Sequence, residues 1–284
     1  MIRLFPFVFI LLWSSAFITT KPIVDNSEPF TALCFRFFFV AIGFFIYSIF
    51  TKKIILDKKN YIIQSLFSGI LFHGLYLGGV FFSVSRGLPT GIAALIVTLQ
   101  PILTNALAGP ILNEKVTWKQ WIGVILGFFG ACLVLGYDVG STLPVIGILA
   151  SIVALIAITA STLWQKKLSN NLPLSVSNMY QAIGGCLFHL ILIIIFVDPY
   201  INFTTTFIIA MSHQIIFVSF GAFTILMYLI KNNSASKTVT IFFLIPATSA
   251  AMAWLFLNES LSTYDIFGFL ITSFGVFIAT RENK

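Results

Sequence analysis

The sequence has little charge. Of its 284 residues only 9% are Asp, Glu, Lys or Arg, whereas 58% are hydrophobic. An ordinary soluble domain carries about 25% charged residues. Because so few charged side chains cannot solvate the surface of a globule of this size, the composition excludes a soluble multidomain protein and favours a membrane protein.

Groups that could carry catalysis or bind a metal are also scarce. The nine Asp and Glu residues fall in loops or at the ends of apolar runs, so the membrane interior lacks the carboxylate pair that an aspartyl-type intramembrane enzyme needs. The sequence contains neither a P-loop nor a zinc-binding His-Glu-x-x-His run. Cys34, Cys132 and Cys186 lie inside apolar runs without metal-binding spacing. We therefore predict no enzymatic activity, no cofactor and no metal.

The apolar residues form ten runs, each about long enough to cross a bilayer as a helix. We expect an all-α membrane protein with ten transmembrane helices, at residues 4–21, 31–50, 62–84, 89–110, 118–137, 143–165, 175–197, 206–229, 237–257 and 263–280.

The positions of Lys and Arg predict the orientation of these helices, because short cytoplasmic loops are enriched in both residues. A cytoplasmic N-terminus leaves only Lys21 and Arg86 in outer loops and Arg36 within a helix. It places the following residues in the cytoplasm: Arg3, Lys52, Lys53, Lys58, Lys59, Lys115, Lys119, Lys166, Lys167, Lys231, Lys237, Arg281 and Lys284. We predict a multi-pass protein of the cell (inner) membrane with both termini cytoplasmic. The net charge of +7 is explained by this topology and by lipid headgroups, so nucleic acid is not a predicted partner.

The chain partly repeats itself after 145 residues. The shift places Pro101 on Pro246 and Glu114 on Glu259, and it also superimposes two pairs of glycines: Gly123 on Gly268, and Gly130 on Gly275. We divide the chain into two repeats, residues 1–140 and 141–284, each with five helices. Because five is odd, the second repeat is expected to be inverted relative to the first, an arrangement common in transporters. The alternative is a duplication within a static bundle.

The matching segments resemble the EamA-type family of the drug/metabolite transporter superfamily. The first set comprises Gly91-Ile92-Ala93-Ala94-Leu95-Ile96, Pro101, Asn113-Glu114-Lys115, Gly123 and Gly130, and the second comprises Pro246, Asn258-Glu259-Ser260-Leu261, Gly268 and Gly275. In the first apolar run, the segment Trp13-Ser14-Ser15-Ala16-Phe17 is similar to the opening helix of that family.

The resemblance implies a ten-helix exporter or exchanger with a central cavity between its halves. Members of the family carry amino acids, other metabolites, sugars, nucleotide-linked sugars or drugs. The small multidrug branch uses an acidic residue in its first helix, whereas helix 1 of this chain has no acid. This difference argues against proton-coupled efflux of cationic drugs by that mechanism.

Polar residues inside the apolar runs are the candidate substrate-binding residues. Arg36 lies about six residues into the second run, where it could face a cavity and attract a carboxylate or, alternatively, extend to the outer interface. His73, with Tyr76 close by, could bind substrate or carry a coupling proton; alternatively, a neighbouring helix satisfies a neutral imidazole. The remaining candidates are Trp13, Ser14, Gln100, Asn105 and Trp164.

Two further pairs of residues occupy matching places in the repeats. Pro101 and Pro246 fall near the centres of their runs, where proline frees a backbone carbonyl, so we consider both to be hinges or packing kinks. Glu114 and Glu259 precede the starts of apolar runs, and we assign them a structural or gating role.

From these observations we expect a secondary transporter, an exporter or exchanger of small polar metabolites such as amino acids, working by alternating access. Its expected partners are a small-molecule substrate, the lipid bilayer and a coupling proton or counter-substrate. The alternatives are multidrug efflux and a non-transporting membrane scaffold.

Overall fold

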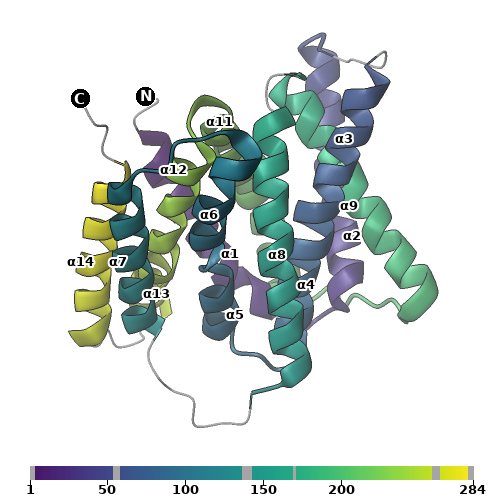
Figure 1. The fold of residues 1–284 in the computed structure, drawn as a ribbon. Helices are drawn as coiled ribbons and strands as arrows, with labels where there is room; N and C mark the ends of the chain where they lie inside the picture. The colour runs from purple at the N-terminus through teal and green to yellow at the C-terminus, as the bar shows by residue number, and fades with distance from the viewer. Residues whose placement is uncertain (1–3, 54–57, 136–142, 169–170, 258–262, 281–284) are drawn as a thin grey trace.

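The computed structural model describes residues 4–53, 58–135, 143–168, 171–257 and 263–280. Within these ranges the chain forms a bundle of helices that run alternately up and down, joined by short connections (Figure 1). The start of the first helix and the end of the last lie at the same end of the bundle, which we call the terminal end (Figure 1). Ser27 and Ile201 form one isolated antiparallel bridge between two connections at the opposite end.

The elements have the following bounds: α1 Phe5–Val24, α2 Pro29–Phe50, α3 Lys59–Gly69, η2 Ile70–Tyr76, α4 Leu77–Ser85, α5 Thr90–Val97, α6 Gln100–Leu112, α7 Trp118–Leu135, α8 Val145–Leu168, α9 Leu174–Phe196, α10 Thr205–His213, η3 Gln214–Ala222, α11 Phe223–Asn232, α12 Ala235–Thr240, η4 Ile241–Phe243, α13 Leu244–Leu257 and α14 Thr263–Thr280.

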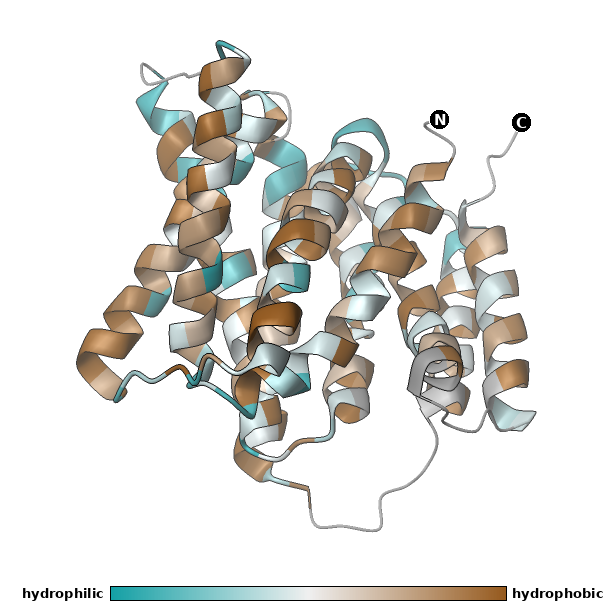
Figure 2. Cartoon of the chain, turned by 180° about the vertical axis from the view of Figure 1, so that it is seen from behind, coloured by the Kyte–Doolittle hydropathy of each residue, from teal (hydrophilic) through white to brown (hydrophobic). Residues whose placement is uncertain are grey.

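Seven helical segments in the described part of the chain are long and apolar enough to span a membrane. They are Phe5–Val24, Pro29–Phe50, Lys59–Ser85, Ile92–Leu112, Val145–Leu168, Leu174–Phe196 and Thr205–Asn232, and two shorter apolar helices cover Trp118–Leu133 and Ile266–Thr280. Hydrophobic residues cover most of the length of the helices, and hydrophilic ones gather toward the two ends (Figure 2). The fold is thus that of an all-helical membrane protein, while the count of ten spans stays a prediction.

Local sequence explains where several helices begin and end. The Glu28 carboxylate accepts hydrogen bonds from the backbone N–H groups of Phe30 (3.0 Å) and Thr31 (2.6 Å), and Pro29 occupies the first position of α2. Both features favour a helix start, because the first turn has unpaired N–H groups and proline lacks one. At the end of α6, Asn113 has the left-handed conformation (φ 56°) that often terminates helices.

Two pairs of helix irregularities lie at matching places in the two halves. The π-helical turns η2 and η3 correspond under the shift of 145 residues, which carries 70–76 onto 215–221. The break at 98–99 between α5 and α6 precedes Pro101, and the 3-10 turn η4 precedes Pro246. Each proline lacks the N–H that would bond to the carbonyl four residues earlier, so the α-helical hydrogen-bond ladder is interrupted there.

The packing of the helices also follows a pattern of pairs. Helix α7 packs along α14, and α2 packs along α9. Helix α1 contacts α13 and the segment α10–η3–α11, while α8 contacts α6 and the segment α3–η2–α4. Under the shift of 145 residues, the contacts of α1 correspond to those of α8. The central region, where these segments meet, holds most of the candidate site.

Candidate functional site

Arg36 of α2 lies inside the bundle. Its side chain is 3% exposed, and its Nε donates a hydrogen bond to Ser219 Oγ of η3 at 2.9 Å. The guanidinium carbon also lies 5.3 Å from the centre of the Phe37 ring. Within the described ranges, no carboxylate forms an ion pair with Arg36. The one salt bridge there joins Lys21 and Asp25, whose side chains are exposed. A permanently charged guanidinium is thus buried without a carboxylate beside it in this part of the structure.

Arg36 borders a small cavity between α1, α2, the η2–α4 segment and η3. Trp13, Tyr76 and Gln214 are among the other residues that line it. The cavity measures about 30 Å³. Since one water occupies about 30 Å³ in the liquid, this conformation has room beside Arg36 for about one water molecule.

Aromatic rings pack around Trp13, which lines the cavity from α1. The Trp13 indole, 4% exposed, packs edge-on against Phe72 at 6.0 Å and against Phe242 at 5.8 Å between ring centroids. Phe72 also packs edge-on against Tyr76 at 5.1 Å. The cavity lining combines Trp13 and Tyr76 of the first half with Gln214 of the second, so the two halves meet at the cavity.

Gln214 and Ser219 contribute to this site, although neither was a candidate from the sequence. Gln214 Nε2 donates hydrogen bonds to the Ala16 carbonyl oxygen and to Thr19 Oγ1, both at 2.9 Å. Its buried Oε1 has no hydrogen-bond partner in the described structure. A glutamine in the middle of the apolar run 206–229 was the available signal, comparable to that of Gln100 in the fourth run.

His73 is buried beside the site but does not line the cavity. Its ring lies 4.3 Å from that of Phe37 and 4.6 Å from that of Phe223, and both ring nitrogens lack hydrogen-bond partners among the described residues. His189 Nε2 donates a hydrogen bond to the backbone carbonyl oxygen of His73 at 3.0 Å. The direction follows because a carbonyl oxygen can only accept. Among the described residues, no neighbouring helix therefore supplies the hydrogen bond to the His73 ring that the alternative interpretation required.

Gln100, Asn105 and Ser14 lie at contacts between helices rather than at the cavity. Gln100 Nε2 donates to Thr162 Oγ1 of α8 at 2.9 Å, and Asn105 is buried with both side-chain polar atoms unpaired in the described structure. Ser14 Oγ donates to the Ile245 carbonyl oxygen of α13 at 3.3 Å. These contacts join helices of opposite halves around Pro101 and Pro246.

Trp164 lies apart from the cavity. Its side chain is 36% exposed, its indole N–H donates to the Gln64 carbonyl oxygen at 3.3 Å, and it packs edge-on against Phe67. This position on the outer face of α8 and α3 does not support the expected contact with substrate.

Glu114 caps the start of α12. Its Oε1 accepts a hydrogen bond from the Ala235 backbone N–H at 2.9 Å, and its Oε2 accepts one from that of Ser236 at 3.4 Å. A carboxylate at this place stabilises the unpaired N–H groups and the positive end of the helix dipole. Glu259 lies outside the described residues.

Comparison with known proteins matches the entire bundle to one family. The model of the EamA-like transporter family matches residues 3–136 and again residues 145–281. The uncharacterized transporter YoaV of Bacillus subtilis is 23% identical over 95% of this chain and 93% of its own length, and YvbV of the same organism is 26% identical over 79% and 72%. A crystal structure with 17% identity superimposes with a TM-score of 0.82, covering 98% of this chain and 96% of the other, which establishes the fold.

Proposed function

The chain belongs to the EamA-like transporter family, and we propose that it exports or exchanges small metabolites that carry a carboxylate, such as amino acids, by alternating access. The family is one of membrane transporters. The proposed substrate class and mechanism come from the residues described above.

The buried charge of Arg36 is the observation that carries this proposal. A charge inside a bilayer costs free energy unless an opposite charge or hydrogen-bond acceptors compensate for it. The described structure gives the guanidinium one acceptor, Ser219 Oγ. A substrate carboxylate would supply two further acceptor oxygens in the geometry that a guanidinium prefers. A cationic drug would instead be repelled.

Three features support two inverted halves, residues 1–140 and 141–284. The family model matches once in each half. The π-helical turns and the proline-associated breaks recur after 145 residues. The packing partners of α1 correspond to those of α8. Two such halves can exchange conformations and thereby expose the same site first on one side of the membrane and then on the other.

The small volume beside Arg36 requires movement before any metabolite can bind there. We assign the hinges to the breaks that precede Pro101 and Pro246, because the interrupted hydrogen-bond ladder bends more easily there. The excess of Lys and Arg supports a cytoplasmic location for the terminal end. A proton, with His73 as its carrier, or a counter-substrate would drive the exchange.

Counterflow into proteoliposomes tests the proposal. Vesicles are preloaded with unlabelled pools of amino acids, organic acids or polyamines, and uptake of a labelled member of each pool is followed. We expect exchange with at least one pool of carboxylates and none with polyamines, because the latter are cations. Exchange of polyamines or hydrophobic cations alone would favour multidrug efflux. Protein-free vesicles provide the background, and no exchange with any pool would favour the scaffold.

A further inference from the structure

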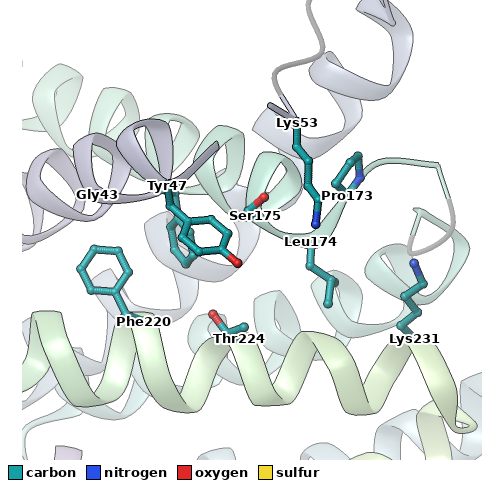
Figure 3. Close-up of a pocket in the computed structure, with 10 residues that line it drawn as sticks. Gly43, Tyr47, Lys53, Pro173, Leu174, Ser175, Phe220, Thr224 and Lys231 are labelled. Carbon is teal, nitrogen blue, oxygen red and sulfur yellow. The ribbon is translucent and has the colours of Figure 1, made fainter. Parts of the chain in front are cut away.

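A second, larger cavity lies near the terminal end of the bundle, separate from the one beside Arg36. It measures about 850 Å³, within the range of small-molecule binding pockets. The end of α2, the start of α9 and the η3–α11 segment surround it (Figure 3). Its lining consists of Gly43, Phe44, Tyr47, Lys53, Pro173, Leu174, Ser175, Phe220, Thr224 and Lys231. We call this cavity the vestibule.

The chemistry of the vestibule suits an organic anion. Lys53 and Lys231 contribute two ammonium groups, and none of the ten lining residues is acidic. The side chain of Lys53 extends toward Leu174, and Tyr47, Ser175 and Thr224 contribute hydroxyl groups (Figure 3). Lys53 and Lys231 lie toward one end and Phe220 toward the other (Figure 3). A small molecule with a carboxylate and a less polar body therefore matches the lining.

Phe220 lines the vestibule and is the neighbour in sequence of the residue that binds Arg36. It directly follows Ser219, whose hydroxyl accepts the hydrogen bond of Arg36. The Phe220 ring packs edge-on against Phe44 at 5.0 Å and fills the space over Gly43, where an added Cβ would lie 2.9 Å from Phe220 Cε1. Because Gly43 has no side chain, the Phe220 ring can lie against the backbone of α2, and it closes the gap between α2 and η3.

The corresponding region in the other half is filled. The shift of 145 residues relates Ser175, which lines the vestibule, to Phe30 at the opposite end of the bundle. The Phe30 ring stacks on Phe82 at 5.8 Å and on His189 at 5.9 Å, so α2, α4 and α9 are packed together there. The bundle is therefore hollowed at the terminal end and closed by aromatic packing at the related place on the other side.

We infer that the vestibule is an anion-binding site through which a carboxylate-bearing substrate reaches Arg36, with Lys53 and Lys231 as its cationic ligands and Phe220 as the plug. This inference rests on the proposed function and adds a second binding site to it. The substrate carboxylate first leaves bulk water and binds the ammonium groups of Lys53 and Lys231. Displacement of the Phe220 ring then opens the way to the guanidinium, which is hydrogen-bonded to Ser219, the residue before Phe220 in η3.

Accessibility of single cysteines tests the pathway without requiring transport. Cys34, Cys132 and Cys186 are replaced by serine, and Thr224→Cys or Ser219→Cys is added. A membrane-impermeant thiol reagent is applied to either side of oriented vesicles. We expect Thr224→Cys to react from the terminal side. Ser219→Cys should react from that side about tenfold more slowly or worse, because the open state is a minor population, and Phe220→Ala should remove the difference.

Protection by ligand tests the binding site. L-serine or succinate is expected to slow the labelling of Thr224→Cys, and the combined Lys53→Ala and Lys231→Ala change should abolish this protection. The combined Lys59→Ala and Lys167→Ala change is the matched control, since these lysines of the same end do not line the vestibule, and it should retain the protection. Putrescine, a cation, should not protect.

The possible results separate this inference from the proposed function. Counterflow of carboxylates together with an unreactive or unprotected Thr224→Cys would overturn the vestibule and leave the transporter intact. Protection without counterflow of any substrate would overturn transport and leave the anion site intact. If added phosphatidylglycerol, and no soluble carboxylate, slows the labelling, the occupant is a lipid and the inference is wrong.

Discussion

Arg36→Ala is expected to abolish counterflow of carboxylate substrates at concentrations that saturate the unmodified protein. A hydrogen bond to a charged group contributes about 1.5–3 kcal/mol, so loss of a single such bond weakens binding roughly 10- to 150-fold, and a bidentate pair has more to lose. The buried guanidinium has one acceptor, Ser219 Oγ, in the described structure, so its removal leaves few protein groups unsatisfied. The measurement is the initial rate of counterflow across a range of substrate concentrations.

Two variants control for effects on folding and for charge. Arg36→Lys keeps the charge but cannot form a bidentate pair, and it should retain a small part of the activity. Arg86→Ala removes an exposed arginine whose guanidinium lies over the Phe82 ring, 4.7 Å from its centre, and it should leave counterflow unchanged. Arg36→Ala with normal counterflow of carboxylates would place the binding site elsewhere.

Gly130→Val is expected to destabilise the protein by about 3 kcal/mol or more, because α7 and α14 pack backbone to backbone there. A Cβ at Gly130 would lie 2.6 Å from the carbonyl oxygen of Gly268, and one at Gly275 would lie 2.7 Å from that of Gly123. A backbone cannot rotate away as a flexible side chain can, so the two helices must move apart. The measurement is the thermal unfolding midpoint in detergent together with the yield of monodisperse protein.

The shift of 145 residues exchanges these two contacts, as expected if a two-fold axis relates the halves. Under the shift, Gly123 corresponds to Gly268 and Gly130 to Gly275, so the contact of Gly123 with Gly275 becomes the contact of Gly268 with Gly130. Gly123→Val should therefore be as harmful as Gly130→Val. Gly109→Ala is the matched control: a Cβ there meets only the Glu114 carbonyl oxygen, at 3.8 Å, and alanine favours a helix. A normal midpoint for Gly130→Val would contradict the close packing.

The positions of helices followed from the sequence because apolar runs are a direct signal of burial in lipid. The predicted run 31–50 corresponds to α2, and the difference at its start arises because the Glu28 side chain caps the helix and Pro29 begins it. The sequence also placed the irregularities near Pro101 and Pro246. The π-helical turns η2 and η3 were not predicted, since they carry no proline and their pattern of apolar residues resembles that of an α-helix.

The site was less predictable because hydropathy does not specify how a helix is rotated about its axis. Arg36 could extend to the interface or point inward, and the answer depends on Ser219, 183 residues later in the chain. Trp164 was a candidate from the sequence because it lies, like Trp13, in the first apolar run of its half, yet its side chain faces outward. The vestibule could not be predicted, because parts of three helices distant in sequence form it.

Ligand-induced stabilisation of the purified protein tests the central claim, that Arg36 binds a carboxylate, most directly. The thermal midpoint is measured with L-serine, its primary amide and putrescine, and then with succinate and succinamide, for the unmodified protein and for Arg36→Ala. A ligand at 100 times its Kd stabilises the native state by about 2.7 kcal/mol. We predict that at least one carboxylate raises the midpoint, that its amide and putrescine do not, and that Arg36→Ala removes the effect. An equal response to acid and amide, or an unchanged response in Arg36→Ala, would contradict the claim.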